Sequence, residues 1–366
     1  MSNSKLFEPI QLGSVILPNR IVIAPMCQYS AEEGSATDWH LMHLGRLATS
    51  GAGLLIIEAT AVEPEGRISP DDLGLYSDAN QQALDGVLKA VRRYTDMPIG
   101  IKLGHAGRKA SIDSPWNGGK QLGLDRRGWN TKAPSAIPMF DGDRIPTALD
   151  TVGLTQVRDA FVASAERAVA LGVDLIELHG AHGYLLHQFL SPLANRRSDQ
   201  YGGSLENRMR FPLEVFDAVK RVLPPALPLG VRISATDWAD GGWDVEQSIA
   251  FARELDERRC HFIHVSSGGV AAKQSISVGP NYQVPFARLI KEAVTMPVIA
   301  VGLITEPDQA EAIVATGDAD MVALARGILF EPTWPWRAAA QLGAKVQAPK
   351  QYLRSQPRRY GNLFEV

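Results

Sequence analysis

The stretch Asp174-Leu175-Ile176-Glu177-Leu178-His179 predicts a short buried strand that ends in a histidine. Seven similar runs recur along the chain, each apolar on both faces rather than alternating, which is typical of parallel strands covered by helices. The eight runs are Ile21–Pro25, Leu54–Glu58, Pro98–Leu103, Asp174–His179, Leu227–Ser234, Phe262–Ser266, Pro297–Gly302 and Met321–Arg326.

Helix-length segments with apolar residues spaced by three and four separate these runs, among them Leu154–Leu171 and Glu306–Ala315. Pro307 lies in the first turn of the second segment and Gly317 just beyond its end, as helix start and stop signals predict. The alternation predicts an α/β fold, a (β/α)₈ TIM barrel formed as one domain by residues 1–366. A doubly wound sheet is the alternative, but no Gly-x-Gly-x-x-Gly follows the first strand.

Two segments depart from the regular alternation. Residues 106–153 are rich in Gly, Pro and Trp, and they come before the single helix needed between the third and fourth strands. An insertion of this length at the carboxyl end of a barrel strand is usually a lid over the site. The last residues, 349–366, form a tail with several Arg and aromatic side chains.

Composition bounds the partners of the chain. Its 366 residues include 37 Lys and Arg against 40 Asp and Glu, with no run of five like charges, which argues against nucleic acid and against an anionic membrane. No apolar stretch approaches the roughly 18 residues of a spanning helix, and the start lacks a signal-peptide core. Cys27 and Cys260 are the only cysteines, too few for a disulfide framework. We therefore expect a cytoplasmic protein.

Chemistry in barrel enzymes lies at the carboxyl ends of strands. His179 ends the fourth run, and His182 and Tyr184 follow in a glycine-flanked loop. Two imidazoles can donate to one carbonyl or phenolate oxygen, and a phenol with an ordinary pKa of about 10 can act as a general acid. The alternatives are a metal-binding pair or core histidines bonded to backbone. A metal hydrolase would need His-x-His at the first strand, which ends instead in Ala24-Pro25-Met26-Cys27-Gln28-Tyr29.

A phosphate site is expected in the loops after the seventh and eighth strands. These loops supply Val301-Gly302 and Ala325-Arg326-Gly327, which combine a backbone that an anion can approach with a guanidinium. The pairing favours a phosphorylated ligand.

Two cations, Lys102 and Arg232, fall inside predicted strands. A buried cation needs a partner, and two readings remain open at this point. The cations could pair with Glu58 and Glu177 on neighbouring strands, or they could face an anionic cofactor such as a reduced flavin in the barrel mouth.

The sequence resembles the Old Yellow Enzyme family, in the class of the bacterial thermophilic-like ene-reductases. The resemblance extends from Leu6 to about Tyr352, and a combination of short motifs carries it. These are Pro25–Tyr29, Glu58–Val62, His105–Ala110, His179–Tyr184, Asn195–Asp199, Tyr201–Ser204 and Asn207-Arg208. One residue departs from the family's pattern, because Lys102 stands where the family usually has glutamine.

The resemblance implies non-covalent FMN, with NADPH or NADH as hydride donor and α,β-unsaturated carbonyl compounds (enones) as substrates, and phenols as further ligands. Tyr184 would donate the proton, His179 and His182 would hold the substrate oxygen with help from Tyr29, and Cys27 would tune the flavin. The residues expected to line the cofactor are Ala24, Pro25, Met26, Cys27, Ala59, Lys102, Arg232, Val301, Gly302, Ala325 and Arg326.

The resemblance also implies a homodimer or dimer of dimers, in which Arg354 of the tail reaches the neighbour's site. Two functions of other kinds remain open. One is a different FMN-barrel oxidoreductase, of the dihydroorotate or dihydrouridine type, and the other is a phenol-binding flavoprotein without catalysis.

Overall fold

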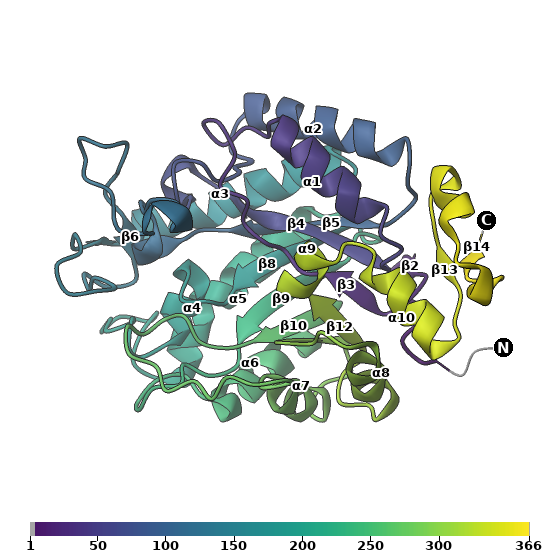
Figure 1. Ribbon diagram of the computed structural model, residues 1–366. Coiled ribbons are helices and arrows are strands. Elements are labelled where there is room, and N and C mark those ends of the chain that lie inside the picture. Colours follow the sequence, from purple (N-terminus) through teal and green to yellow (C-terminus); the bar gives the residue numbers. More distant parts are fainter. Residues whose placement is uncertain (1–3, 366) are drawn as a thin grey trace.

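Eight parallel strands close into a barrel in the computed structural model of the chain, which describes residues 4–365 (Figure 1). Each of the eight apolar runs overlaps one of these strands, so the predicted TIM barrel is confirmed. The strands are β3 (Ile21–Ile23), β4 (Leu54–Ala61), β5 (Ile99–Gly104), β8 (Leu175–Gly180), β9 (Leu229–Ser234), β10 (Phe262–Ser266), β11 (Val298–Val301) and β12 (Met321–Leu324).

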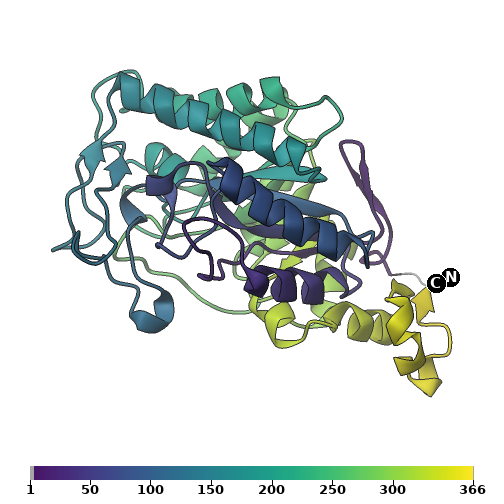
Figure 2. The ribbon, with the colours of Figure 1, turned by 90° about the horizontal axis from the view of Figure 1, so that it is seen from above.

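Helices follow the strands and surround the barrel (Figures 1 and 2). Four of these helices have an N-cap residue whose side chain accepts a backbone N–H of the first turn, namely Ser77, Asp150, Ser204 and Asp244. The longer helices are α1 (Asp38–Ala48), α2 (Asp78–Arg92), α3 (Thr151–Ala170), α5 (Leu205–Val222), α6 (Val245–Glu257), α7 (Val284–Lys291), α8 (Pro307–Ala315) and α10 (Trp334–Leu342). The shorter ones are α4 (Leu185–Leu190) and α9 (Arg326–Phe330).

A hairpin of β1 (Ile10–Leu12) and β2 (Val15–Leu17) covers the amino-terminal end of the barrel. Leu12 and Leu17 pack into one apolar cluster with Phe262, which fills the barrel interior at this end. The hairpin was not assigned from the sequence. With this end closed by apolar side chains, polar chemistry is confined to the opposite end.

The segment after β5 contains only two turns of 3₁₀ helix and the two-residue strands β6 (Lys132–Ala133) and β7 (Thr147–Ala148) before α3 begins. It leaves the carboxyl end of β5 and extends beyond the barrel on the side away from the chain termini (Figures 1 and 2). Its role as a lid stays a prediction.

The tail packs at the amino-terminal end of the barrel. After β13 (Val346–Gln347), which pairs with β14 (Phe364–Glu365), the chain lines a groove with the residues that follow α1 and α2. The Tyr352 ring lies 6.2 Å from that of Trp336 on α10. The carboxyl ends of α1 and α2 lie beside the starts of β4 and β5, so this position is remote from the carboxyl ends of the strands (Figure 2).

Gly230 provides a test of the packing inside the barrel. A Cβ on Gly230 would lie 2.3 Å from Cζ of Phe262, which is fully buried, so the ring would have to move. We expect Gly230→Ala to lower the free energy of unfolding by about 1–3 kcal/mol, the usual cost of overpacking. Urea denaturation measures this. Gly86→Ala on α2, where a Cβ would meet nothing within 4 Å, is the control and should raise stability.

Candidate active site

Three rings gather at the carboxyl end of β8. The His179 ring lies 5.1 Å from that of His182 and 5.0 Å from that of Tyr184, each pair edge-on. His179 is buried, yet neither of its ring nitrogens has a hydrogen-bond partner among residues 4–365. A buried polar group without a partner is costly, so both nitrogens are suited to binding a ligand atom.

Burial sets the protonation of these three groups. It holds the pKa values of His179 and His182 well below their ordinary range, and the nearby cations Lys102 and Arg232 lower them further. Burial likewise raises the pKa of Tyr184 well above its ordinary value, aided by Cys27. At neutral pH the cluster therefore carries two neutral imidazoles and a protonated phenol, each able to donate a hydrogen bond.

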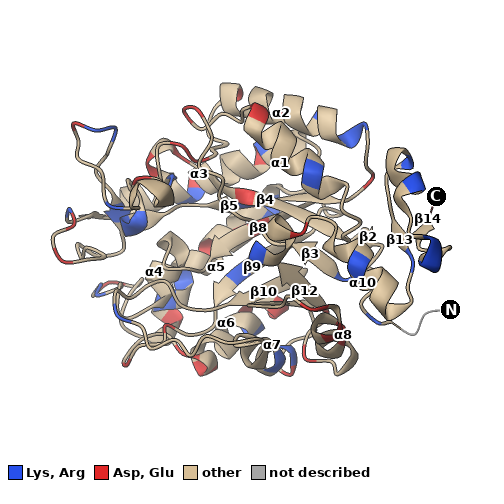
Figure 3. Cartoon of the chain, in the orientation of Figure 1, with Lys and Arg blue, Asp and Glu red and all other residues tan. Residues whose placement is uncertain are grey.

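Lys102 and Arg232 lie inside the barrel without a carboxylate partner. They are 3% and 6% exposed, and in the described part of the chain neither has a carboxylate oxygen within 4.0 Å (the cation of β9 is visible in Figure 3). Burial and the charge of Arg232 lower the pKa of Lys102 to about 8. Two buried cations without a direct ion pair favour an anion in the barrel mouth.

The expected alternative partners are engaged elsewhere. Glu177 accepts from His264 Nδ1 at 2.8 Å, and Glu58 accepts from the backbone N–H of Gln28 and lies 3.3 Å from His40 Nε2. Among residues 4–365, no direct ion pair joins Lys102 or Arg232 to these two carboxylates, although Glu177 attracts both cations from a greater distance.

The loops after β11 and β12 lie side by side, because those strands pair. Gly302 has a φ of +128°, and a Cβ there would lie 2.6 Å from Nε2 of Gln283, so only glycine fits. Ala325 and Arg326 lie directly after the neighbouring strand β12, at the start of α9. The predicted phosphate-binding residues are thus brought together.

The first strand places Cys27 beside the ring cluster. Ala59 belongs to an apolar cluster against which Cys27 and Tyr184 pack, and the Tyr29 ring meets that of Trp116 edge-on at 5.6 Å. Burial, followed by the charges of Asp72 and Glu58, raises the pKa of the Cys27 thiol, which is therefore neutral.

Cys27, Glu58 and Asp72 offer ligand atoms within 4.8 Å of one another, a spacing that a metal ion could use. Burial and Glu58 raise the pKa of Asp72 to about 7, so this carboxyl holds a proton over much of the acidic range. A metal would have to displace protons from both Cys27 and Asp72, which disfavours it.

Two further residues at the site were not assigned from the sequence. Lys109 donates from Nζ to the carbonyls of His182 and Gly269, and it lies 5.1 Å from the centre of the Tyr184 ring. Ser266 Oγ lies 2.8 Å from His182 Nε2. Their positions in the sequence could have indicated both residues, since Ser266 ends the sixth strand and Lys109 lies in the His105–Ala110 motif after the third strand.

Comparison with known proteins decides the family. A sequence model of the NADH:flavin oxidoreductase / NADH oxidase family matches residues 5–345. The chain belongs to this family. The resemblance to the Old Yellow Enzymes is thereby confirmed, and with it FMN as cofactor and NAD(P)H as reductant.

Members of the NADH:flavin oxidoreductase family resemble the chain over nearly its whole length. An NADPH dehydrogenase of Bacillus licheniformis is 44% identical over 97% of this chain and 100% of its own. An NADPH dehydrogenase of a Geobacillus species is 43% identical over 95% of this chain and 98% of its own. The structure of morphinone reductase in complex with tetrahydroNAD superposes with a TM-score of 0.75 at 30% identity, covering 94% of this chain and 92% of the other.

The residues present fit FMN. The unpaired cations Lys102 and Arg232, the free nitrogens of His179 and the cradle at Gly302 all meet the needs of an anionic, hydrogen-bonding ligand.

Within residues 4–365, no helix combines the length and apolar character that crossing a membrane requires.

The raised pKa of Asp72 makes stability depend on pH. The folded state binds this proton more tightly than the unfolded state, whose pKa is near 3.8, so its contribution falls as pH rises through about 7. Asp72→Asn removes this loss. We expect the melting temperature of the variant, relative to the parent, to be higher at about pH 8 than at about pH 5. Asp71→Asn, in the same turn but half-buried and paired with Arg127, is the control. A pH-independent difference would contradict the assignment.

Proposed function

We propose that the chain is an FMN-dependent ene-reductase, which passes hydride from NAD(P)H to the β-carbon of α,β-unsaturated carbonyl compounds. The cluster of two neutral imidazoles and a protonated phenol at the barrel mouth carries this proposal. Bound FMN supplies the hydride chemistry, and the protein supplies position and polarity.

The loops and strands of the barrel mouth would hold the cofactor without a covalent bond. Gly302 and Arg326 would bind the phosphate, while Lys102 and Arg232 would face the anionic edge of the ring. The remaining contacts would come from Ala24, Pro25, Met26, Cys27, Ala59, Val301 and Ala325.

The substrate's carbonyl oxygen would lie between His179 and His182, with Tyr29 as a further contact. Neutral imidazole N–H groups stabilise the negative charge that develops on this oxygen, each by about 3–4 kcal/mol when well placed. Tyr184 would give its proton to the α-carbon, which a protonated phenol can do. Residues 106–153 would act as the lid, which the contact of Trp116 with Tyr29 supports.

A direct experiment separates this function from the alternatives. The purified protein should release FMN on denaturation and should oxidise NADPH when cyclohexenone is present. Turnover of dihydroorotate or of a dihydrouridine-containing RNA instead would indicate another FMN-barrel oxidoreductase. Phenol binding without turnover of any of these would indicate a binding protein.

Tyr184→Phe tests the proposed proton donor. Only reduction of the enone needs the phenolic proton, so we expect reoxidation of the reduced enzyme by cyclohexenone to slow by about 10²–10⁴-fold. Reduction by NADPH should change little. Anaerobic stopped-flow measurement follows the two half-reactions separately. Equal slowing of both would mean that Tyr184 only positions ligands.

We further propose that Arg354 completes the site of a second copy in a homodimer or dimer of dimers. The tail packs at the amino-terminal end of its own barrel, remote from Tyr184, and Arg354 is exposed there. An arginine so placed can serve a site only on another molecule, and a closed dimer gives each barrel one such residue.

Subunit exchange tests this proposal. Tyr184→Phe and Arg354→Ala should each be impaired, whereas mixed dimers contain one site with both native residues. We expect activity after exchange to rise above that of either parent. No recovery, with mixed dimers demonstrated by mass spectrometry, would exclude action across the interface.

A further inference from the structure

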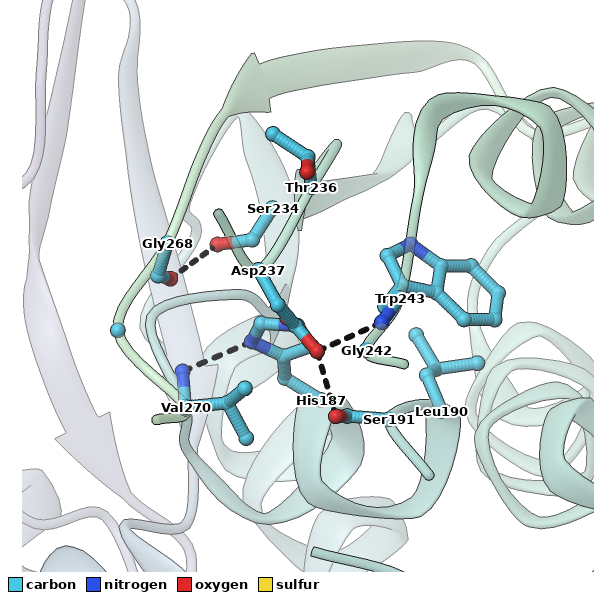
Figure 4. A network of polar contacts seen from close by, with 12 residues as sticks. His187, Leu190, Ser191, Ser234, Thr236, Asp237, Gly242, Trp243, Gly268 and Val270 are labelled. Carbon is cyan, nitrogen blue, oxygen red and sulfur yellow. Dashed lines mark hydrogen bonds and ion pairs between the residues drawn. The ribbon is translucent and has the colours of Figure 1, made fainter. Parts of the chain in front are cut away.

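Figure 4 shows a buried histidine–aspartate pair, His187 and Asp237, with the polar groups around it. His187 Nε2 on α4 lies 2.9 Å from Asp237 Oδ1, in the segment after β9, and both side chains are fully buried. The other oxygen, Oδ2, accepts from Ser191 Oγ at 2.6 Å and from the backbone N–H of Trp243 at 2.7 Å. Two hydrogen bonds therefore hold Oδ2, and Oδ1 faces Nε2 of His187 as an ion-pair contact.

The second nitrogen of His187 reaches the active-site loop. Its Nδ1 accepts the backbone N–H of Gly183 at 2.8 Å, so Nδ1 carries no proton and Nε2 presents its N–H to Asp237. Burial alone would raise the pKa of Asp237, but His187 and the hydrogen bond from Ser191 hold it below its ordinary value. An ionised Asp237 thus fixes the tautomer that Gly183 requires.

Side chains bond all four backbone groups of His182 and Gly183. The N–H of His182 donates to Ser234 Oγ at 2.9 Å, and its carbonyl accepts from Lys109 Nζ at 2.8 Å. The N–H of Gly183 donates to His187, and its carbonyl accepts from Gln188 Nε2 at 2.7 Å. No helix or strand holds this dipeptide, so side chains alone determine its orientation.

The dipeptide also has an unfavourable backbone conformation. His182 has a φ of +58° and Gly183 of +73°, both in the left-handed region. A Cβ on Gly183 would lie 2.0 Å from the carbonyl oxygen of Gly269. A non-glycine residue such as His182 pays about 1–2 kcal/mol in this region, so it stays there only when the surroundings hold it.

We propose that the His187–Asp237 pair is a positioning device of the active site. It fixes the Gly183 peptide between the two ring-bearing residues, and thereby the direction of the His182 imidazole and the Tyr184 phenol. Assigning chemistry to these two rings rests on the proposed function. His187 and Asp237 themselves act through the backbone, and the loop conformation they impose can be measured without turnover.

Three variants of the FMN-loaded enzyme test the proposal. His187→Ala should slow reoxidation by cyclohexenone by about 10–100-fold, the effect of misplacing a catalytic group by about 1 Å, and should weaken binding of 4-hydroxybenzaldehyde. His187→Asn should recover part of both, because its side-chain oxygen can accept the Gly183 N–H as Nδ1 does. Asp237→Asn should impair the same step, although Asp237 has no hydrogen bond to the loop. FMN content and melting temperature show whether each variant is folded.

Two matched controls separate positioning from general stability. Ser191→Ala removes one hydrogen bond from the same carboxylate but leaves His187 bonded to it. His261→Ala removes a histidine that also accepts a backbone N–H, that of Leu229, at the amino-terminal end of the barrel. His261→Ala should retain the parent's rate of reoxidation and its phenol affinity, and Ser191→Ala should be impaired less than His187→Ala, because His187 still faces the carboxylate.

The proposal is overturned if His187→Ala keeps the parent's rate and phenol affinity, or if His187→Asn is no better than His187→Ala. It is also overturned if His261→Ala or Ser191→Ala is impaired as strongly as His187→Ala. Should the parent itself fail to reduce enones, the proposed function fails instead. The positioning role is then decided by hydrogen exchange at the Gly183 amide, which should be fast in His187→Ala and slow in the parent and in His261→Ala.

Discussion

The site depends on two positive charges that the barrel buries without a direct ion pair. Lys102 on β5 and Arg232 on β9 lie on strands that both flank β8. Glu177 on β8 would be the natural counter-ion, and in the sheet it is in register with Lys102, but it bonds His264 instead. Neither cation therefore has a direct ion pair in the protein alone, and an anionic ligand could provide one.

The same charges determine how the neighbouring rings function. His179 is in register with Arg232 on the neighbouring strand, and a nearby cation disfavours a second positive charge. Burial and this repulsion therefore both keep the His179 imidazole neutral. A neutral imidazole donates a hydrogen bond without bringing a full charge that would have to be desolvated. In the proposed function, the cations would face the cofactor while the adjacent neutral histidines would bind the carbonyl oxygen of the substrate.

The sequence predicted the parts of this arrangement that depend on strand order. Runs such as Phe262–Ser266 became strands because a helix-covered parallel strand needs apolar residues on both faces, and residues at strand ends, such as His179, necessarily meet at one end of a barrel. Partner choice was not predictable. Glu177 and His264 are 87 residues apart, with β9 between their two strands, so no local pattern links them. The β1–β2 hairpin has strands of three residues, too short for a periodic signal.

The loop of His182 and Tyr184 shows why such a site needs more of the fold than its own strand. A left-handed dipeptide cannot be held by a helix or a sheet, so its polar groups must be bonded by side chains from elsewhere. Ser234 comes from the end of β9, Lys109 from the segment after β5, and His187 and Gln188 from α4. Because the strands on both sides of β8 contribute, a change in either neighbouring loop would alter the positions of the His182 and Tyr184 side chains. In this barrel, the conformation of one loop therefore depends on residues that follow three different strands, β5, β8 and β9. The sequence after any one of these strands cannot change without affecting that loop.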